Sequence, residues 1–295
     1  MKNSYVFVYG TLRSNLSNHY LLKDANVISK QCWTSGMLYD VGYGYPAMAL
    51  NYESNVYGEL YLVSEKELEQ LDWLEGYKEN RINNHYERIL QTVYTDKGIS
   101  YEAYVYVYGD NQVTDLQRIE YGDWKYYLSL RKKSLCYFAY GSCMDDRRFI
   151  KQKVAHLFQD IVDSGILPNY QLAFTRKADD GGRADIIEGI GEVEGKIYRV
   201  NQEAVSYLEK REGVLYGTYR PTFVDVKTSK TVFKDVLTYV VINKEEETAP
   251  PIKYAAEILR GSACCLSEKY RMKLLRDLEV KFGLNFDDIF AEMKK

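Results

Sequence analysis

The sequence contains few of the residues on which metal and disulfide chemistry depends. It has three histidines, and its five cysteines are an odd number with no Cys-x-x-Cys pair among 295 residues. A disulfide framework and a zinc ribbon therefore do not fit, and histidine is a poor default choice for catalysis. The carboxylates are the better place to look for a catalytic acid or base.

Long apolar runs and a strong net charge are missing as well. No run approaches the roughly 18 apolar residues of a membrane span, and residues 1–10 turn into strand-like sequence without a signal-peptide core. The net charge is −3 and the isoelectric point is near 5.8, which argues against a protein dedicated to polyanions. We expect a soluble cytoplasmic protein that binds neither nucleic acid nor membrane.

The standard signatures of phosphate binding and nucleophilic catalysis are also absent. The sequence has no G-x-G-x-x-G, G-x-x-x-x-G-K-[ST], G-x-S-x-G or H-E-x-x-H motif. His19, His85 and His156 have no metal-ligand spacing, so we expect each to be structural or solvated. Cys264 and Cys265 are neighbours in a predicted helix, where their side chains would diverge and could not share one site.

The chain does have enough length for two domains and an unusual amount of tyrosine. At roughly 150 residues per domain, 295 residues predict about two domains. Hydrophobic residues make up 46% and charged residues 27%, as in ordinary globular proteins, so either half can bury its own core. The 29 tyrosines suit half-buried strands, because the ring is apolar and its tip is polar.

Four short segments recur in the same order in the two halves of the chain. The offset of a pair is the number of residues between the matching positions of its two segments. The second and third pairs share one offset, which is slightly larger than that of the first pair. Four matches in one order predict a tandem duplication, diverged in sequence but similar in layout. The matched pairs are 5–11 with 136–142, 56–63 with 193–200, 71–76 with 208–213, and Tyr86 and Arg88 with Tyr219 and Arg220.

The seam between the halves falls at 121–133, where a short predicted helix runs into a basic stretch. We therefore predict domains at 1–130 and 135–295. Residues 1–130 carry 11 basic and 17 acidic side chains and the remainder carries 28 and 25, so the net charges are −6 and +3. The second half is the better candidate for an anionic ligand, unless the difference reflects only solvated surface.

The coarse secondary structure is mixed. Each half opens with a predicted strand, 5–9 or 136–140, which ends at glycine and leads through polar residues toward a helix start. The order has no regular βαβα alternation, which favours an α+β fold with mostly antiparallel pairing. Further predicted strands cover 56–63, 101–108, 193–200 and 236–242, and predicted helices precede the two Glu-Gly pairs and cover 252–260 and 266–281.

The Tyr-Gly turn after each opening strand is a candidate binding element. A strand that ends in glycine and leads toward a helix exposes successive N–H groups, which suit carboxylates and oxyanions. An ordinary tight turn would use the same residues. Glu75 and Glu212 follow the two turns at matching positions of the repeat, although a glutamate at a helix end is commonly solvated. A single carboxylate beside an anion-binding turn suits proton abstraction by a partly buried glutamate.

These motifs resemble those of the γ-glutamylcyclotransferase-like proteins. The first half is similar to the γ-glutamylamine cyclotransferase and AIG2-like branch, and the second resembles classical γ-glutamylcyclotransferase. The resemblance spans nearly the whole chain and implies a small mixed β-barrel with flanking helices in each half. It is carried by 6–13, 71–76 and 122–124 in the first half and by 137–142, 212–214, 249–254, 261–263 and Leu266 in the second.

The resemblance also implies an activity that needs no metal or cofactor. A small-molecule γ-glutamyl amide would cyclise to 5-oxoproline and release the free amine. Carried over by position, Glu75 and Glu212 would be the general bases. The implied substrate-binding residues are Tyr9, Gly10, Thr11 and Leu12 in the first half, and Tyr137, Phe138, Ala139, Tyr140, Gly141, Ser142 and Tyr254 in the second.

One departure from the family pattern lies in the second turn, where Cys143 follows Ser142 in place of the usual Asn. It leaves open the substrate preference and the competence of that half, and a duplicated domain can serve as a scaffold. Two other interpretations stay open. One is a module that binds γ-glutamyl compounds without turnover, and the other is an acyltransferase or hydrolase with an external amine or water as acceptor. The sequence does not identify the substrate's amine or the oligomeric state.

Overall fold

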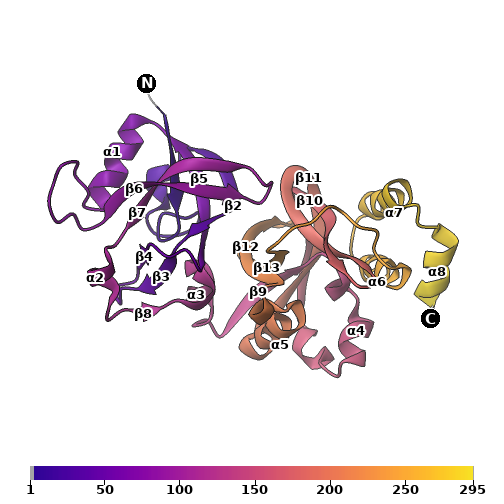
Figure 1. Ribbon diagram of the computed structural model, residues 1–295. Helices are drawn as coiled ribbons and strands as arrows, with labels where there is room; N and C mark the ends of the chain where they lie inside the picture. Colours follow the sequence, from indigo (N-terminus) through magenta and orange to yellow (C-terminus); the bar gives the residue numbers. More distant parts are fainter. Residues whose placement is uncertain (1–2, 295) are drawn as a thin grey trace. The chain divides into compact units, whose positions relative to one another are not determined.

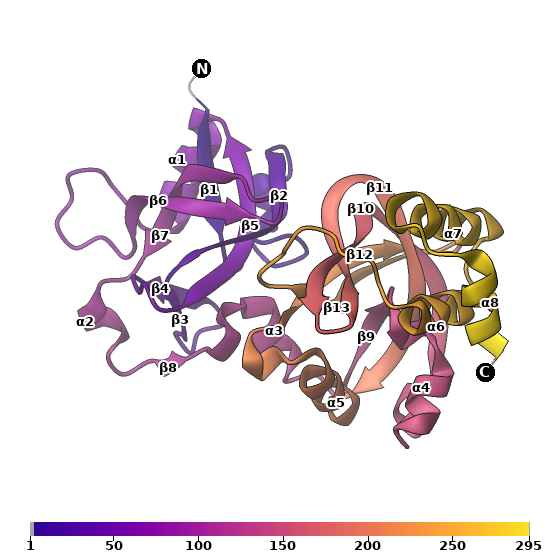
Figure 2. The ribbon, with the colours of Figure 1, turned by 45° about the vertical axis from the view of Figure 1, so that its right-hand side comes forward.

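The computed structural model describes residues 3–294, which divide into two compact units between Leu128 and Ser129 (Figures 1 and 2). Each unit contains one closed barrel of five strands with helices around it. The prediction of an α+β protein built from two small barrels is therefore confirmed. Within residues 3–294, no helix has both the length and the apolar composition needed to cross a membrane.

The first barrel has the strand order β1-β5-β2-β6-β7. Its neighbouring strands pair antiparallel, except that β1 and β7 run parallel and close the barrel where Val6 meets Tyr104. A smaller sheet of order β4-β3-β8 accompanies it. The strands are β1 (Ser4–Val8), β2 (Asn26–Ser35), β3 (Met37–Asp40), β4 (Pro46–Ala49), β5 (Asn55–Val63), β6 (Glu87–Thr95), β7 (Ser100–Val107) and β8 (Gln117–Arg118).

The second barrel has the strand order β10-β11-β9-β13-β12. It too is antiparallel throughout except at one closing contact, where β9 and β13 run parallel and Tyr137 meets Leu237. Its longest strands form one extended hairpin, visible in Figure 2. The strands are β9 (Ser134–Ala139), β10 (Ile161–Ala178), β11 (Gly181–Asn201), β12 (Tyr219–Lys227) and β13 (Val232–Val241).

Helices connect and flank the strands of both units. The α-helices of the first unit and of the seam are α1 (Glu65–Leu74), α2 (Asp110–Val113) and α3 (Trp124–Ser129). Those of the second unit are α4 (Asp146–Lys151), α5 (Gln202–Glu212), α6 (Ile252–Ser262), α7 (Glu268–Phe282) and α8 (Phe286–Lys294). Short 3-10 helices are η1 (His19–Leu22), η2 (Glu120–Gly122), η3 (Ser142–Met144), η4 (Ala155–Phe158) and η5 (Val214–Tyr216).

The two barrels share one topology and one register. If β1 corresponds to β9 and β5 to β11, the remaining strands match in the same cyclic order. Val8 pairs with Glu59 in the first barrel, and Ala139 pairs with Lys196 in the second. The offset from Val8 to Ala139 is that of the repeated opening strands, and the offset from Glu59 to Lys196 is that of the second repeated segment. The duplication is therefore present in strand pairing as well as in sequence.

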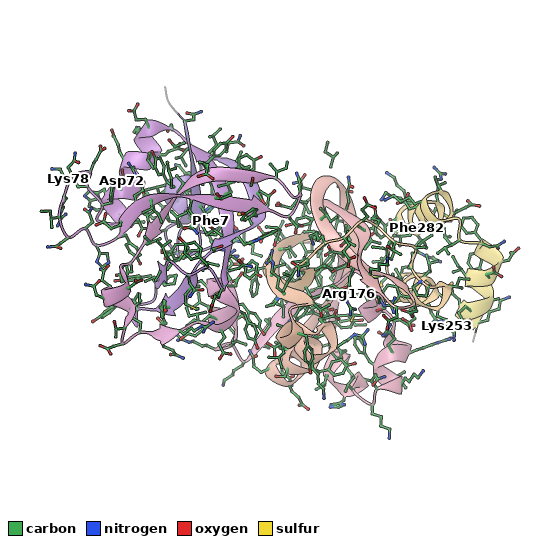
Figure 3. All side chains as sticks on the ribbon, viewed as in Figure 1. Phe7, Asp72, Lys78, Arg176, Lys253 and Phe282 are labelled. Atoms are coloured by element: carbon green, nitrogen blue, oxygen red, sulfur yellow. The ribbon has the colours of Figure 1, made fainter. Side chains whose placement is uncertain are left out.

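Strand β1 is apolar from Tyr5 to Val8 because both of its faces are covered. Phe7 belongs to one buried cluster, together with residues of the other barrel strands, and lies within the first barrel in Figure 3. Val6 and Val8 point the other way and join a second cluster that includes Leu71 of α1. Side chains that alternate between two buried faces produce a continuous hydrophobic run instead of an alternating one.

A glycine lies beneath an aromatic ring at the same place in both barrels. A Cβ on Gly58 would come within 2.4 Å of the Val8 carbonyl and 2.7 Å of the Phe7 ring. A Cβ on Gly195 would come equally close to the Ala139 carbonyl and the Phe138 ring. Because backbone and packed ring cannot both move aside, only glycine fits here.

The Glu-Gly pairs end two helices, as the sequence predicts. Ser64 and Glu67 form a reciprocal capping box at the start of α1, and Asn201 caps α5 through the backbone N–H of Ala204. Gly76 and Gly213 each have φ of +65°, a left-handed conformation that favours glycine after a helix. The preceding Glu75 and Glu212 are thereby held at the helix C-termini.

At one pair of matching positions, the two units bury side chains of opposite charge. Glu59 accepts hydrogen bonds from the Ser14 hydroxyl and the Tyr61 hydroxyl, and it contacts Arg13 and Lys125 at 3.7 and 3.6 Å. Burial raises the pKa of Glu59, but Lys125 and Arg13 outweigh burial and lower this pKa to about 2. The matching residue of the second unit, Lys196, is cationic.

Lys196 is buried and makes contacts of the opposite polarity. It donates a hydrogen bond of 2.6 Å to the Met144 carbonyl and lies 3.4 Å from an Asp146 carboxylate oxygen. In both units the buried charge holds the chain just beyond the Tyr-Gly turn. The two units therefore stabilise the same loop with charges of opposite sign.

Some elements differ from the sequence-based predictions. Strands β2, β6, β10 and β12 were not predicted, because their apolar residues follow no clean alternation. The segment after the first turn forms only the short 3-10 helix η1, whereas α4 follows the second turn. The expectation that Cys264 and Cys265 diverge is wrong, because they lie in a turn after α6 and their Sγ atoms are 3.3 Å apart.

The variant Gly58→Ala tests the ring-on-glycine packing. We expect it to lower the free energy of unfolding of the first unit by about 3 kcal/mol, as overpacking of a rigid site does. Trp33, Trp73 and Trp124 all belong to the first unit, so urea unfolding followed by tryptophan fluorescence reports on that unit. The control is Gly109→Ala, where the nearest atoms are exposed side-chain oxygens, and equal losses for both variants would contradict the packing argument.

Candidate active sites in the two units

The first unit has a cavity of about 430 Å³ at the end of β1. Its wall combines the Tyr-Gly turn with the end of α1 and with aromatic residues from the neighbouring loops. Among residues 3–294, no lysine or arginine lines it. The lining residues are Phe7, Val8, Tyr9, Gly10, Thr11, Leu12, Ser17, Asn18, Tyr43, Gly44, Tyr45, Pro46, Leu74, Glu75, His85, Tyr86 and Tyr106.

Tyrosine hydroxyls fix the frame of this cavity. The Tyr9 hydroxyl donates to the Tyr106 carbonyl at 2.8 Å, and the Tyr86 hydroxyl donates to the Pro46 carbonyl at 2.9 Å. Gly10 lies so close to Pro46 that a Cβ would come within 2.9 Å of its ring. The turn thus packs closely against Pro46, and both contribute to the cavity wall.

Backbone N–H groups of the turn are available to a ligand. Within residues 3–294, the N–H groups of Gly10, Thr11 and Leu12 donate to no acceptor, while the Gly10 carbonyl is used by Arg13. Buried N–H groups normally find a partner, so a cluster of unused donors at a cavity wall suits an anionic or carbonyl oxygen of a ligand.

Glu75 is the carboxylate of this cavity. Burial raises its pKa from 4.5 to about 7. Among residues 3–294, no side chain forms an ion pair or hydrogen bond with its carboxylate. Its place at the C-terminal end of α1 also disfavours negative charge, because the helix dipole is negative there. A carboxyl group with these properties exchanges its proton near neutral pH.

The second unit has a smaller and more polar cavity of about 160 Å³ at the end of β9. It is again built from the Tyr-Gly turn and the end of a helix, here α5. The hydroxyls of Tyr140 and Tyr219 donate to the carbonyls of Tyr239 and Ala184, which repeats the frame of the first cavity. The lining residues are Tyr137, Tyr140, Gly141, Ser142, Cys143, Arg148, Arg176, Arg183, Ala184, Arg211, Glu212, Tyr219, Tyr239 and Tyr254.

Arginines distinguish this cavity from the first. Within residues 3–294, Arg176 forms no ion pair or hydrogen bond with an acid, although its charge acts on Glu212, and its guanidinium carbon lies 5.9 Å from the centre of the Tyr219 ring. Figure 3 labels Arg176 among the side chains of the second unit. The cavity therefore holds one positive charge more than its own acids balance. The other three arginines are paired: Arg148 with Glu257, Arg183 with Asp180, and Arg211 with Glu212.

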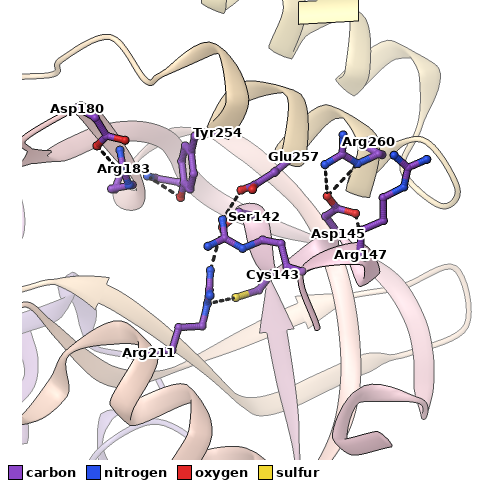
Figure 4. A network of polar contacts seen from close by, with 12 residues as sticks. Ser142, Cys143, Asp145, Arg147, Asp180, Arg183, Arg211, Tyr254, Glu257 and Arg260 are labelled. Atoms are coloured by element: carbon purple, nitrogen blue, oxygen red, sulfur yellow. Dashed lines mark hydrogen bonds and ion pairs between the residues drawn. The ribbon is translucent and has the colours of Figure 1, made fainter. Parts of the chain in front are cut away.

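Glu212 is less isolated than Glu75. Burial raises its pKa, and the neighbouring Arg211, whose Nε lies 3.5 Å from Glu212 Oε1, opposes that shift. The Cys143 thiol also donates to this carboxylate at 3.7 Å. Figure 4 shows Arg211 reaching Cys143 and Ser142, with Tyr254 facing them from α6. As in the first unit, the N–H groups of Gly141, Ser142 and Cys143 donate to no acceptor within residues 3–294.

The structure brings most of the predicted site residues together in these two cavities. Glu75 with Tyr9 to Leu12, and Glu212 with Tyr140 to Ser142, Tyr137 and Tyr254, are all lining residues. Phe138 and Ala139 do not line the second cavity. They are fully buried in β9, where the Phe138 ring covers Gly195 and Ala139 pairs with Lys196.

Several lining residues were not predicted as site residues. His85, expected to be structural or solvated, lines the first cavity, and its Nε2 lies 3.0 Å from the Tyr108 hydroxyl. Tyr86 and Tyr219 occupy matching places, and their repetition in the sequence was the available signal. The arginines gave no local signal, because the helices and long strands that carry them meet only in the fold. Within residues 3–294, no three His, Cys, Asp or Glu side chains gather as a metal site would require.

Comparison with known proteins identifies the class of both units. A family described as "Gamma-glutamyl cyclotransferase, AIG2-like" matches residues 6–126, and the "AIG2-like family" matches residues 192–274. The chain belongs to the γ-glutamylcyclotransferase family and consists of two such domains in tandem. The assignment of each half to a particular branch of the family, and the boundaries 1–130 and 135–295, stay predictions.

A relative with the same two-domain extent is YkqA of Bacillus subtilis, which carries the provisional name of a gamma-glutamylcyclotransferase. It is 42% identical over 283 residues, which cover 94% of this chain and 98% of that protein. The crystal structure of YkqA superposes with a TM-score of 0.84 over the same shares of both chains at 41% identity. The gamma-glutamylcyclotransferase of Bos taurus is 31% identical over 137 residues, 44% of this chain and 71% of that protein.

The raised pKa of Glu75 predicts a pH-dependent stability. Folding raises this pKa from 4.5 to about 7, so its favourable contribution is complete below pH 4.5 and is lost as pH rises through 7. The variant Glu75→Gln removes the titration. We expect the stability of wild type relative to the variant to fall by about 3 kcal/mol between pH 4.5 and 8.

Urea unfolding followed by tryptophan fluorescence at both pH values measures this difference in the first unit. The matched control is Glu69→Gln, at an exposed glutamate of the same helix, which should change stability equally at both pH values. A pH-independent difference between wild type and Glu75→Gln would show that Glu75 does not titrate in this range.

Proposed function

We propose that each unit converts a γ-glutamyl amide to 5-oxoproline and a free amine, with Glu75 and Glu212 as general bases. One observation carries the proposal: in both cavities a buried carboxyl with a raised pKa shares the wall with a turn of unused backbone N–H groups. Membership in the γ-glutamylcyclotransferase family supports the same substrate class.

The reaction is a ring closure within the substrate. The α-amine attacks the γ-carbonyl carbon, a five-membered lactam forms, and the bond to the leaving amine breaks. The cavity has to hold the substrate in a folded conformation, and orientation of this kind can lower a barrier by up to about 7–11 kcal/mol. The hydroxyls of Tyr9 and Tyr140 tie the turns to the neighbouring strands, which supports such a role for the walls of both cavities.

The protein's chemical contribution is a proton transfer and an anion site. The α-amine is an ammonium at neutral pH and cannot attack until it loses a proton. Glu75, with a pKa of about 7, accepts that proton and can return it to the leaving nitrogen. The N–H groups of the turn would hold the α-carboxylate or the oxyanion that develops on the γ-carbonyl.

The two cavities favour amines of different charge. In the part of the chain that the structure describes, no lysine or arginine lines the first cavity, and its aromatic walls suit a neutral or cationic amine. In the second cavity, Arg176 supplies one unbalanced positive charge. A released amine that carries its own carboxylate, such as an amino acid, would balance this charge. We therefore assign γ-glutamyl compounds whose amine part carries a carboxylate to the second unit.

The variants Glu75→Gln and Glu212→Gln test the roles of the two bases. Glutamine keeps the shape and the hydrogen bonds of the side chain but cannot accept a proton. We expect each variant to lose at least about 100-fold in kcat for the substrates of its own unit. Substrate binding should persist in each. Release of 5-oxoproline from a panel of γ-glutamyl amines and γ-glutamyl amino acids, paired with calorimetry, measures both effects.

The double variant Glu75→Gln, Glu212→Gln decides between turnover and binding alone. Full release of 5-oxoproline by the double variant would exclude the mechanism. Binding without product in the wild-type protein would identify a γ-glutamyl-binding module, and glutamate in place of 5-oxoproline would identify a hydrolase.

The variant Arg176→Gln tests the charge assignment. In a Glu75→Gln background, we expect it to raise the KM for γ-glutamyl amino acids by about 10- to 100-fold, the worth of one charge-assisted contact. The KM for γ-glutamyl amines whose amine part has no carboxylate should stay unchanged. Arg199→Gln, which removes an exposed arginine paired with Asp160, is the control. Equal effects on both substrate groups would refute the assignment.

A further inference from the structure

Three polar groups, one from β9 and two from the end of α5, converge on the sulfur of Cys143 in the second cavity. Arg211 donates through Nε to Sγ at 3.3 Å, and the Tyr137 hydroxyl donates to the same atom. The thiol in turn donates to Glu212 Oε1 at 3.7 Å. Figure 4 shows the Arg211 contact directly.

These contacts are not those of a structural cysteine. A buried cysteine ordinarily behaves as a small hydrophobic side chain among apolar neighbours. Here the sulfur has two donors that would stabilise a thiolate and one carboxylate that can take its proton. Arg211 also lies 3.5 Å from Glu212 Oε1, so one residue orients the base and faces the sulfur. Nucleophile, base and orienting group within reach of one another are the usual arrangement for covalent catalysis.

The first unit lacks this arrangement at the matching position. The offset that relates the two Tyr-Gly turns brings Cys143 onto Leu12, which lines the first cavity but has no nucleophilic atom. Arg211 likewise has no cationic counterpart in the lining of the first cavity. The second unit therefore adds Cys143 and Arg211 to a frame of tyrosines and glycine that both units share.

We propose that Cys143 is a nucleophile that carries the γ-glutamyl group as a thioester during turnover by the second unit. The inference rests on the proposed function, since it uses the same substrates and the same cavity. Cys143 Sγ attacks the γ-carbonyl carbon while Glu212 takes the thiol proton. Glu212 passes that proton to the leaving nitrogen as the C–N bond breaks, which releases the amine and leaves the thioester.

The thioester then closes to the lactam. The α-ammonium gives one proton to Glu212, and the freed α-nitrogen attacks the thioester carbon. The C–S bond breaks, and the departing sulfur takes the second proton of that nitrogen, which restores the thiol. Glu212 returns its proton to the released amine or to solvent. The sequence of steps consumes no oxidant, reductant or further reactant.

The resting state of the pair fits this order of proton transfers. Burial raises the pKa of the Cys143 thiol, and Arg211 opposes the shift. Burial also raises the pKa of Glu212. The thiol therefore rests protonated, and the neighbouring carboxylate is a stronger base than an exposed glutamate. A thiol activated at the moment of attack by an adjacent base is consistent with both shifts.

Full-length Glu75→Gln protein isolates the second unit for the test. With γ-glutamylalanine as substrate and hydroxylamine as a competing acceptor, we expect γ-glutamyl hydroxamate beside 5-oxoproline. We also expect a mass increase of one γ-glutamyl group on the peptide containing Cys143. Adding Cys143→Ala should abolish the hydroxamate and the adduct and lower 5-oxoproline release by at least about 100-fold.

The controls separate this proposal from the proposed function. Cys136→Ala, at a cysteine outside the cavity lining, should change neither product. Calorimetric binding of γ-glutamylalanine by the Cys143→Ala protein confirms that the cavity is intact. Undiminished 5-oxoproline release after Cys143→Ala would overturn the thioester and leave the Glu212 mechanism standing. Absence of any product from the Glu75→Gln protein would refute turnover by the second unit, and the thioester with it.

Discussion

Each site depends on the parallel contact that closes its barrel. The first strand of each unit pairs on one edge with an antiparallel strand. On its other edge it pairs in parallel with the last strand of the barrel. Because both edges are paired, the strand has no freedom to slide. The hydroxyls of Tyr9 and Tyr140 then bond to carbonyls of those last strands. The turn that follows is fixed opposite the end of the helix that carries the glutamate.

Much of this arrangement follows from short-range sequence signals. The Tyr-Gly strands, the Glu-Gly helix ends and their order predict two similar units, and strand pairing reproduces the offsets between the repeated segments. These signals are readable because each one reflects a local requirement, such as the left-handed conformation of Gly76 and Gly213. Both glutamates lie in the predicted cavities for the same reason.

The parts that the sequence did not predict depend on contacts between distant segments. Arg176 and Arg211 lie on a long strand and a helix end, and only closure of the barrel brings them into one cavity. Phe138 is one of the implied substrate-binding residues, yet in β9 its ring packs on Gly195 and does not line the cavity. Resemblance carries over a whole motif, whereas in the fold only some of its residues line the cavity.

The inverted charge beneath the two turns has an evolutionary consequence. Exchange of the segment around Glu59 with that around Lys196, as recombination between the duplicated halves would produce, would place an ammonium beside Arg13 and Lys125. The reciprocal product would bury a carboxylate with no cation. Either hybrid carries an uncompensated interior charge, which costs several kcal/mol. Recombination that would make the two halves alike is therefore disfavoured, and the two cavities can retain different side chains.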